Sequence, residues 1–192
     1  MTDDTKTSEP KQPADRIFAG LVWAESGNPF FYCVIGEKRS DKSKSFDESK
    51  PVLEILGEDE LRTFTELTGA LEIFPLLHRC NTVYTVLEPK YLTYVRNFNT
   101  WRRDKKTKIV LKQTKSSSFE ASLLQIKELI GEKRLIFPED SIIKAQLTVF
   151  SKSNLKDAVD FYAVRALTLV IDAFQKKTVL ETTEVPNLRA WY

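Results

Sequence analysis

The sequence predicts one α/β domain with a mixed sheet of about five strands flanked by helices. Two observations come from the start of the chain. Residues 16–25 and 30–36 are short, nearly continuous apolar runs typical of buried strands, and the turn residues Ser26 to Pro29 between them favour a hairpin. A third is that strand-like runs later alternate with helix-like segments. Together these patterns favour a sheet that is antiparallel at its start and parallel later.

A third strand and a helix are expected after the hairpin. Residues 51–56 favour a short strand, and apolar residues at helical spacing predict a helix over 58–79. The acids within Gly57 to Glu60 would begin that helix, because negative charge is favourable at the positive end of the helix dipole. Pro75 favours a kink, or an early end near Glu72.

The elements that follow alternate up to the last helix. In chain order they are a strand over 82–87, a short aromatic helix or irregular segment over 91–101, a strand over 109–111, a helix over 119–130 capped by Gly131, an extended piece over 135–137 and a helix or partly helical segment over 141–150. The strand over 82–87 ends at Glu88 and Pro89, because proline cannot donate a hydrogen bond to a neighbouring strand.

The last helix is expected from Asn154 to about Lys177. Its apolar stripe has helical spacing and consists of Val159, Ala163, Ala166, Val170 and Phe174. Asn154 is a suitable N-cap. Asp157 and Asp160 stand three positions apart in the first turns, so they are expected to share a face of this helix.

Length and composition indicate one soluble domain over residues 16–177, between a disordered N-terminal tail over 1–15 and a C-terminal tail over 178–192. Hydrophobic residues make up 42% of the chain and charged residues 29%, which is ordinary for a globular protein. No apolar run approaches the ~20 residues that span a bilayer, and the segment Met1 to Ala14 lacks the apolar core of a secretory signal. We therefore expect no membrane partner and a cytoplasmic location, in the host cell if the protein is viral.

Several chemistries are disfavoured by the residue types present. The chain has one histidine, His78, and two cysteines, Cys33 and Cys80, so no structural zinc site is expected. Both cysteines are expected to be reduced and buried. The scattered glycines form no phosphate-binding loop, and no GxSxG motif indicates a serine nucleophile.

The net charge of +2 is too small to indicate nucleic-acid binding by itself, but basic residues are concentrated in one run. The run consists of Arg102, Arg103, Lys105, Lys106 and Lys108, and we expect Lys112 and Lys115 to border the same edge. It predicts either a solvated loop or a surface that contacts phosphates. The interleaved aromatic residues would be either stacking residues or core; they are Tyr91, Tyr94, Phe98 and Trp101.

Four short motifs follow one another along the chain. They are Gly20-Leu-Val-Trp-Ala24, Val86-Leu-Glu-Pro89, Gly131-Glu-Lys-Arg-Leu-Ile-Phe-Pro138 with Ile143-Lys-Ala-Gln-Leu147, and Lys156-Asp-Ala-Val-Asp-Phe-Tyr-Ala163. In this order they resemble the ribonuclease H-like fold, and more narrowly the nuclease domain of phage terminase large subunits. The resemblance covers roughly Arg16 to Phe174.

The resemblance implies a site with two divalent metal ions, Mg²⁺ or Mn²⁺, about 4 Å apart and held by converging carboxylates. By position, Glu88 would be the catalytic ligand from the central strand, and Asp157 and Asp160 would be the catalytic ligands from the last helix. The first-strand acid of the family falls on Val22 in this chain, and valine cannot bind a metal. Glu25, three residues later, is the nearest substitute ligand.

Two functions follow from the resemblance. The first is a terminase-like, metal-dependent DNA endonuclease domain that acts in viral genome packaging or processing. The alternative is an inactive ribonuclease H-like domain that binds DNA or a packaging partner. Either would work with a separate packaging ATPase or portal, because this chain has no ATPase half. The near-neutral charge also leaves open a protein-interaction module with no nucleic-acid role.

Overall fold

The computed structural model of the protein describes residues 16–24, 29–38, 51–77, 82–86, 92–104, 109–114, 119–150 and 161–182. Within these residues, six strands form one sheet, which confirms the α/β class and adds one strand to the five expected. The strands are β1 (Ile17–Trp23), β2 (Pro29–Lys38), β3 (Val52–Glu60), β4 (Thr82–Val86), β5 (Val110–Thr114) and β6 (Leu135–Ile136). The helices are α1 (Phe64–Leu77), α2 (Leu92–Asp104), α3 (Phe119–Gly131), α4 (Ile142–Val149) and α5 (Tyr162–Thr182).

The sheet has the order β5-β4-β1-β2-β3-β6. Strand β2 is antiparallel to both of its neighbours, whereas β4 is parallel to β1 and β5, and β6 is parallel to β3. Five strands therefore run in one direction, as expected for a sheet that is antiparallel first and parallel later. The edge where β1, β3, β4 and β5 end, at Trp23, Glu60, Val86 and Thr114, is called the carboxyl edge below, and the opposite one the amino edge.

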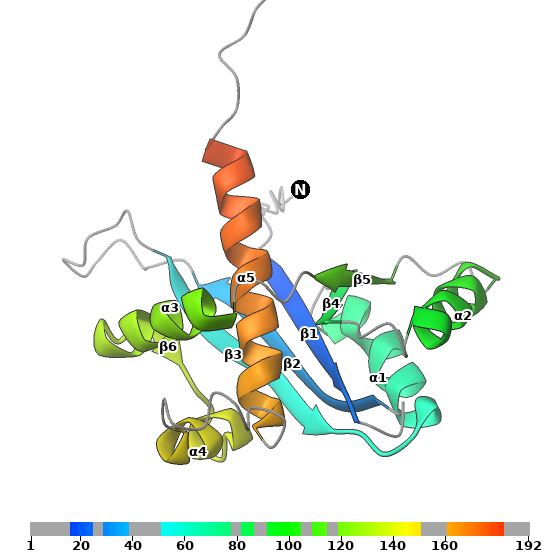
Figure 1. Cartoon of the computed structure of the whole chain (residues 1–192), viewed down its shortest axis with the longest axis horizontal. Helices are drawn as coiled ribbons and strands as arrows, with labels where there is room; N and C mark the ends of the chain where they lie inside the picture. Colours follow the sequence, from blue (N-terminus) through cyan, green and yellow to red (C-terminus); the bar gives the residue numbers. More distant parts are fainter. Residues whose placement is uncertain are drawn as a thin grey trace, which may run out of the picture.

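Helices cover both faces of the sheet. Helix α5 crosses the middle of one face, with α3 and α4 beside it, as Figure 1 shows. Helices α1 and α2 pack on the other face. Side chains of a strand alternate between faces, so Phe18 and Val22 of β1 contribute to the core under α5, whereas Leu21 and Trp23 contribute to the core under α1.

Helix α5 lies directly on β1 because Gly20 has no side chain. A Cβ atom at Gly20 would lie 2.6 Å from Val170 Cγ2 and 2.7 Å from the backbone oxygen of Ala166. Further along, the ring of Phe174 packs edge-to-face on Phe18 with centroids 5.7 Å apart. Helix α5 therefore runs antiparallel to β1. The described residues of the predicted apolar stripe are buried: Ala163, Ala166, Val170 and Phe174.

The predicted start of this helix at Asn154 is wrong. Helix α5 begins at Tyr162, and the amide of Arg165 donates to the carbonyl of Phe161 at 2.9 Å, as expected at a helix start. Asp157 and Asp160 therefore precede α5 instead of lying in its first turns, and both fall outside the described residues. At the other end, α5 continues to Thr182, beyond the expected domain boundary at residue 177, and its last turns extend past the sheet (Figure 1).

A second correction concerns the acids after residue 56. Gly57 to Glu60 do not begin a helix but lengthen β3, where Glu60 pairs with Phe31 of β2. Helix α1 begins only at Phe64. Two hydrogen bonds similar to a capping box fix its start: Thr63 Oγ1 accepts from the amide of Glu66 at 3.2 Å, and Glu66 Oε2 accepts from the amide of Arg62 at 2.6 Å. Helix α1 also runs past Glu72 to Leu77 despite Pro75.

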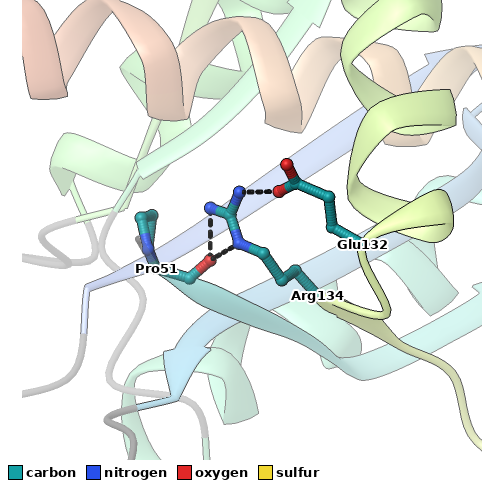
Figure 2. Close-up of polar contacts among 3 residues, drawn as sticks. All are labelled: Pro51, Glu132 and Arg134. Atoms are coloured by element: carbon teal, nitrogen blue, oxygen red, sulfur yellow. Dashed lines mark hydrogen bonds and ion pairs between the residues drawn. The ribbon is translucent and has the colours of Figure 1, made fainter. Parts of the chain in front are cut away.

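The end of α3 differs from the expected glycine cap. Gly131 is the last helical residue, and the residue with left-handed backbone is Lys133, with φ 57°. The amide of Lys133 donates to Ile130 O and that of Arg134 donates to Leu129 O, which is the Schellman pattern. The Arg134 guanidinium then ties this turn to the start of β3, because Nε and Nη2 donate to the Pro51 carbonyl while Nη1 contacts Glu132 (Figure 2).

Replacing Lys133 with glycine is expected to stabilise the protein by about 0.5–1 kcal/mol. A non-glycine residue in the left-handed region costs about 1–2 kcal/mol, and the larger entropy that glycine loses on folding offsets part of this gain. Urea unfolding measures the change. Lys127, exposed in the middle of α3, provides the control, since Lys127→Gly should lose about 1 kcal/mol. A loss at both positions would contradict the left-handed cap.

Helix α2 is joined to β5 by one asparagine. Asn99 Nδ2 donates to the backbone oxygen of Leu111, and Asn99 Oδ1 accepts from the amide of the same residue, both at 3.0 Å. Among the described strands, β5 is the last on its side of the sheet. The Asn99 side chain thus uses both backbone groups that Leu111 turns away from β4.

Candidate functional site at the carboxyl edge

The strand order singles out one place on the sheet. From β1, the chain builds β2 and β3 on one side and then returns to build β4 and β5 on the other. In open α/β sheets, ligands bind outside the carboxyl ends of the strands at such a reversal. The candidate site is therefore the carboxyl edge at β1 and β4.

A buried hydrogen-bonded network joins the ends of β1 and β4 at this site. The indole Nε1 of Trp23, at the end of β1, donates to Thr85 Oγ1 of β4 at 2.8 Å. The Thr85 hydroxyl in turn donates to the backbone oxygen of Leu21 at 2.8 Å. Thr85 has no exposed surface, so this network ties the ends of the two strands together below the site.

Val22 occupies the position of the first-strand acid in the resembled family. Its side chain is 5% exposed and belongs to the apolar cluster under α5. A hydrocarbon side chain has no atom that can coordinate Mg²⁺ or Mn²⁺. This position therefore does not fit the two-metal centre that the resemblance implies.

Acidic side chains reach the carboxyl edge from β3, where the sequence predicted a helix start. Glu58 Oε2 accepts a hydrogen bond from the amide of Ile143 at 3.0 Å, and Ser141 Oγ caps the same helix, α4, by accepting from the amide of Lys144. The other Glu58 oxygen, Oε1, is buried and has no hydrogen-bond partner within the part of the chain that the structure describes. Burial, and secondarily the charge of Glu58, raise the pKa of the Cys33 thiol well above its ordinary value. As expected, Cys33 is a buried free thiol.

The start of α5 is held at this edge by Tyr162. Its hydroxyl donates to Glu60 Oε1 at the end of β3, and its ring packs on Phe30 with centroids 4.5 Å apart. Gln146 Oε1 of α4 accepts from the amide of Ala163 at 2.9 Å. The hydrogen bond to Glu60, followed by burial, raises the pKa of Tyr162 to about 12. Helices α4 and α5 and strand β3 thus meet beside the candidate site.

Stability that depends on Tyr162 is expected to disappear in strong alkali. Because the folded-state pKa, about 12, lies above the ordinary value of 10.0, the hydrogen bond contributes fully below pH 10 and is lost as the pH rises toward 12. Urea unfolding of the wild type and Tyr162→Phe tests this. The difference between the two proteins should be constant from about pH 7 to pH 9 and should shrink above about pH 10. A difference that stays constant up to about pH 11.5 would contradict the assignment.

The four predicted metal ligands, Glu25, Glu88, Asp157 and Asp160, lie outside the described residues. The described chain ends that adjoin them do come together: β1 ends at Trp23, β4 ends at Val86, and α5 begins at Tyr162 on the same edge. Among the residues that the structure describes, no group of three or more His, Cys, Asp or Glu side chains could hold a metal ion.

The predicted phosphate-contacting residues fall on two ends of β5. Arg102 and Arg103 are in the last turn of α2, and the chain passes from there to the start of β5 at the amino edge. Lys112 is exposed within β5. Lys115 directly follows β5 at the carboxyl edge, so the basic run and Lys115 adjoin opposite ends of this strand. Lys105, Lys106, Lys108 and Lys115 lie outside the described residues.

The aromatic residues near the basic run divide between core and surface. Phe98 is 6% exposed and packs under the sheet with the half-buried Trp101, at a centroid distance of 5.7 Å. Tyr94 is 44% exposed. Tyr91 lies outside the described residues. Phe98 is therefore a core residue, whereas the exposed ring of Tyr94 is accessible for stacking.

No protein-family model matches this chain, and no curated protein is significantly similar to it in sequence. Among the described residues, no helix combines the length and the apolar character needed to cross a membrane. What the candidate site can do follows from its own residues and from the strand order.

Proposed function

We propose that this protein is a ribonuclease H-like domain of the phage terminase type that binds DNA during viral genome packaging or processing. The observation that supports this most strongly is the strand order. Ribonuclease H-like sheets have a central first strand with an antiparallel neighbour on one side, parallel strands on the other and a final helix across it. The order β5-β4-β1-β2-β3, with α5 on β1, agrees with that arrangement.

Binding without cleavage is the form of this function that Val22 favours. The resembled nucleases depend on an acid at that position, and here the position is apolar and buried. Cleavage would require a carboxylate from another element to replace the acid that is missing at this position. The domain would then act beside a packaging ATPase or portal on a separate chain, in the cytoplasm of the host cell.

Helix α2 is the element that we propose contacts the DNA backbone. From Leu92 to Arg103 it carries three arginines and no acid. Arg96 is exposed, and Arg103 follows it by seven positions, so the two Cα atoms lie on one side of the helix. Arginine side chains that contact phosphates release counterions, which makes binding weaken as salt is added.

The proposed contact between α2 and the DNA backbone is tested by fluorescence anisotropy with a labelled duplex of about 20 base pairs. The wild type should bind in about 50 mM salt, and the double variant Arg96→Gln/Arg103→Gln should bind at least tenfold more weakly. Its slope of log affinity against log salt should be smaller by about 1.8, because each phosphate contact contributes about 0.9. Lys127→Gln, on the opposite face of the sheet, is the matched control and should change little. A loss in log affinity per removed charge that is the same in the double variant and in Lys127→Gln would show that net charge alone matters.

The second candidate function is the metal-dependent endonuclease. It is favoured by the shared edge at which the chain enters the segments that carry Glu88, Asp157 and Asp160. Incubation of supercoiled plasmid with the protein and Mn²⁺ separates the two candidates. Nicking that disappears in Glu88→Ala would establish cleavage. Intact plasmid, together with salt-sensitive duplex binding, would leave binding as the function.

A further inference from the structure

We infer that Tyr94 is a stacking platform for an unpaired nucleobase, so that the DNA held at the carboxyl edge includes single-stranded nucleotides. This inference rests on the proposed DNA binding. It names the form of DNA that the site takes, which neither the strand order nor the charge of α2 determines.

Three aromatic rings form a continuous row from the core to the surface. Trp23 at the end of β1 contacts Phe64, the first residue of α1, with ring centroids 5.9 Å apart. Phe64 in turn contacts Tyr94, in the first turn of α2, with centroids 6.1 Å apart. The exposed fraction is 6% at Trp23 and 44% at Tyr94, and Phe64 is half-buried. The outermost ring is therefore supported from below by a packed neighbour.

The base of this row is fixed. Trp23 is held by the hydrogen bond from its indole to the buried Thr85 hydroxyl. Phe64 packs between this fixed ring and Tyr94, so Tyr94 has a packed neighbour that limits its rotation, and a ligand that stacks on Tyr94 removes less rotational freedom. Because α1 follows β3 and α2 follows β4, the row opens at the carboxyl edge, where the topology predicts a ligand.

The charge around Tyr94 suits a nucleotide. Arg62 and Arg96 are exposed and stand near Phe64 and Tyr94 in the chain. Neither guanidinium makes an ion pair with any of the described residues. Glu66, two positions after Phe64, has one carboxylate oxygen engaged by the amide of Arg62. Stacking on an aromatic ring beside free cations is how single-stranded nucleic acid is bound without sequence preference.

Other exposed apolar side chains do not share these properties. Leu124 is 61% exposed and Val149 is 68% exposed, but they lie on α3 and α4, over the opposite face of the sheet. Neither has a planar face on which a base could stack. Leu124 therefore provides a matched control for the loss of an exposed apolar side chain.

The test compares three fluorescent ligands: a thymidine decamer, an abasic phosphodiester chain of the same length, and a duplex. Base stacking contributes several-fold to more than a hundredfold in affinity for each base. Wild type and Leu124→Ala should bind the decamer at least tenfold more tightly than the abasic chain. Tyr94→Ala should remove most of that difference and bind the abasic chain as the wild type does, while Tyr94→Phe should stay within about twofold of the wild type.

The outcomes separate this inference from the proposed function. If Tyr94→Ala binds the decamer as tightly as the wild type, or weakens the decamer and the abasic chain equally, the stacking role is wrong even though DNA binding stands. If the wild type binds none of the three ligands, the proposed function fails, and the stacking role fails with it. Circular dichroism of each variant establishes that it is folded.

Discussion

Replacing Gly20 with alanine is expected to destabilise the protein by about 3 kcal/mol, which corresponds to a melting temperature roughly 6–12 °C lower. The new methyl group would meet Val170 Cγ2 at 2.6 Å and the Ala166 carbonyl oxygen at 2.7 Å. The side chain of Val170 can rotate, but the carbonyl belongs to the helix backbone. Helix α5 must therefore move away from β1, which loosens the core on both sides of the contact.

Gly69 offers the matched control for this substitution. It lies within α1, and a Cβ atom there would have no heavy atom within 4 Å. Gly69→Ala should therefore raise stability by about 0.5–1 kcal/mol, because alanine is the better helix former. Chemical denaturation and calorimetry measure both variants. A Gly20→Ala protein as stable as the wild type would contradict the direct packing of α5 on β1.

Replacing Thr85 with valine is expected to cost about 2–3 kcal/mol. Valine keeps the size and the branching of threonine but removes the hydroxyl that accepts from the Trp23 indole and donates to the Leu21 carbonyl. Both hydrogen bonds are buried, and a buried polar group that loses its partner costs about 1–3 kcal/mol. Denaturant unfolding gives the total change, and near-ultraviolet circular dichroism reports the indole environment.

Thr85→Ser separates the hydroxyl from the methyl group. Serine retains both hydrogen bonds and loses one methyl, so its cost should be about 1 kcal/mol. If serine and valine cost the same, the hydroxyl contributes nothing beyond its volume. Because the network supports the row of rings at the candidate site, Thr85→Val is also expected to weaken binding of the thymidine decamer, whereas Thr85→Ser is not.

The parts of the fold that could be predicted from the sequence are those set by local patterns. Burial is recorded directly in the sequence at these places. Strands β1 and β2 are nearly continuous apolar runs, and the stripe from Ala163 to Phe174 has helical spacing. The start of α1 was missed because the helical spacing that includes Leu61 extends backward into β3. The informative signal was the pair Thr63 and Glu66: the Thr63 hydroxyl accepts from the Glu66 amide, and the Glu66 carboxylate accepts from the amide of Arg62 just before the helix.

Long-range geometry accounts for what the sequence could not indicate. Glu58 and Glu60 suited a helix dipole by composition, but their carboxylates bind the Ile143 amide and the Tyr162 hydroxyl, 85 and 102 positions away. The burial of Val22 could be expected from its apolar run. In contrast, the placement of Arg103 before one end of β5 and of Lys115 after the other end depends on the direction of the strand in the sheet. The exposure of Tyr94 beside the buried Phe98 likewise depends on how α2 packs.

The Asn99 side chain has a consequence for behaviour at high protein concentration. A strand at the border of a sheet offers free amide and carbonyl groups to any extended chain, and such borders are common starting points for aggregation. Asn99 imitates the backbone of a further strand, since its amide group supplies one donor and one acceptor to Leu111. Among the described residues, where β5 is the border strand, the backbone groups of Leu111 that a foreign strand would pair with are thus already engaged.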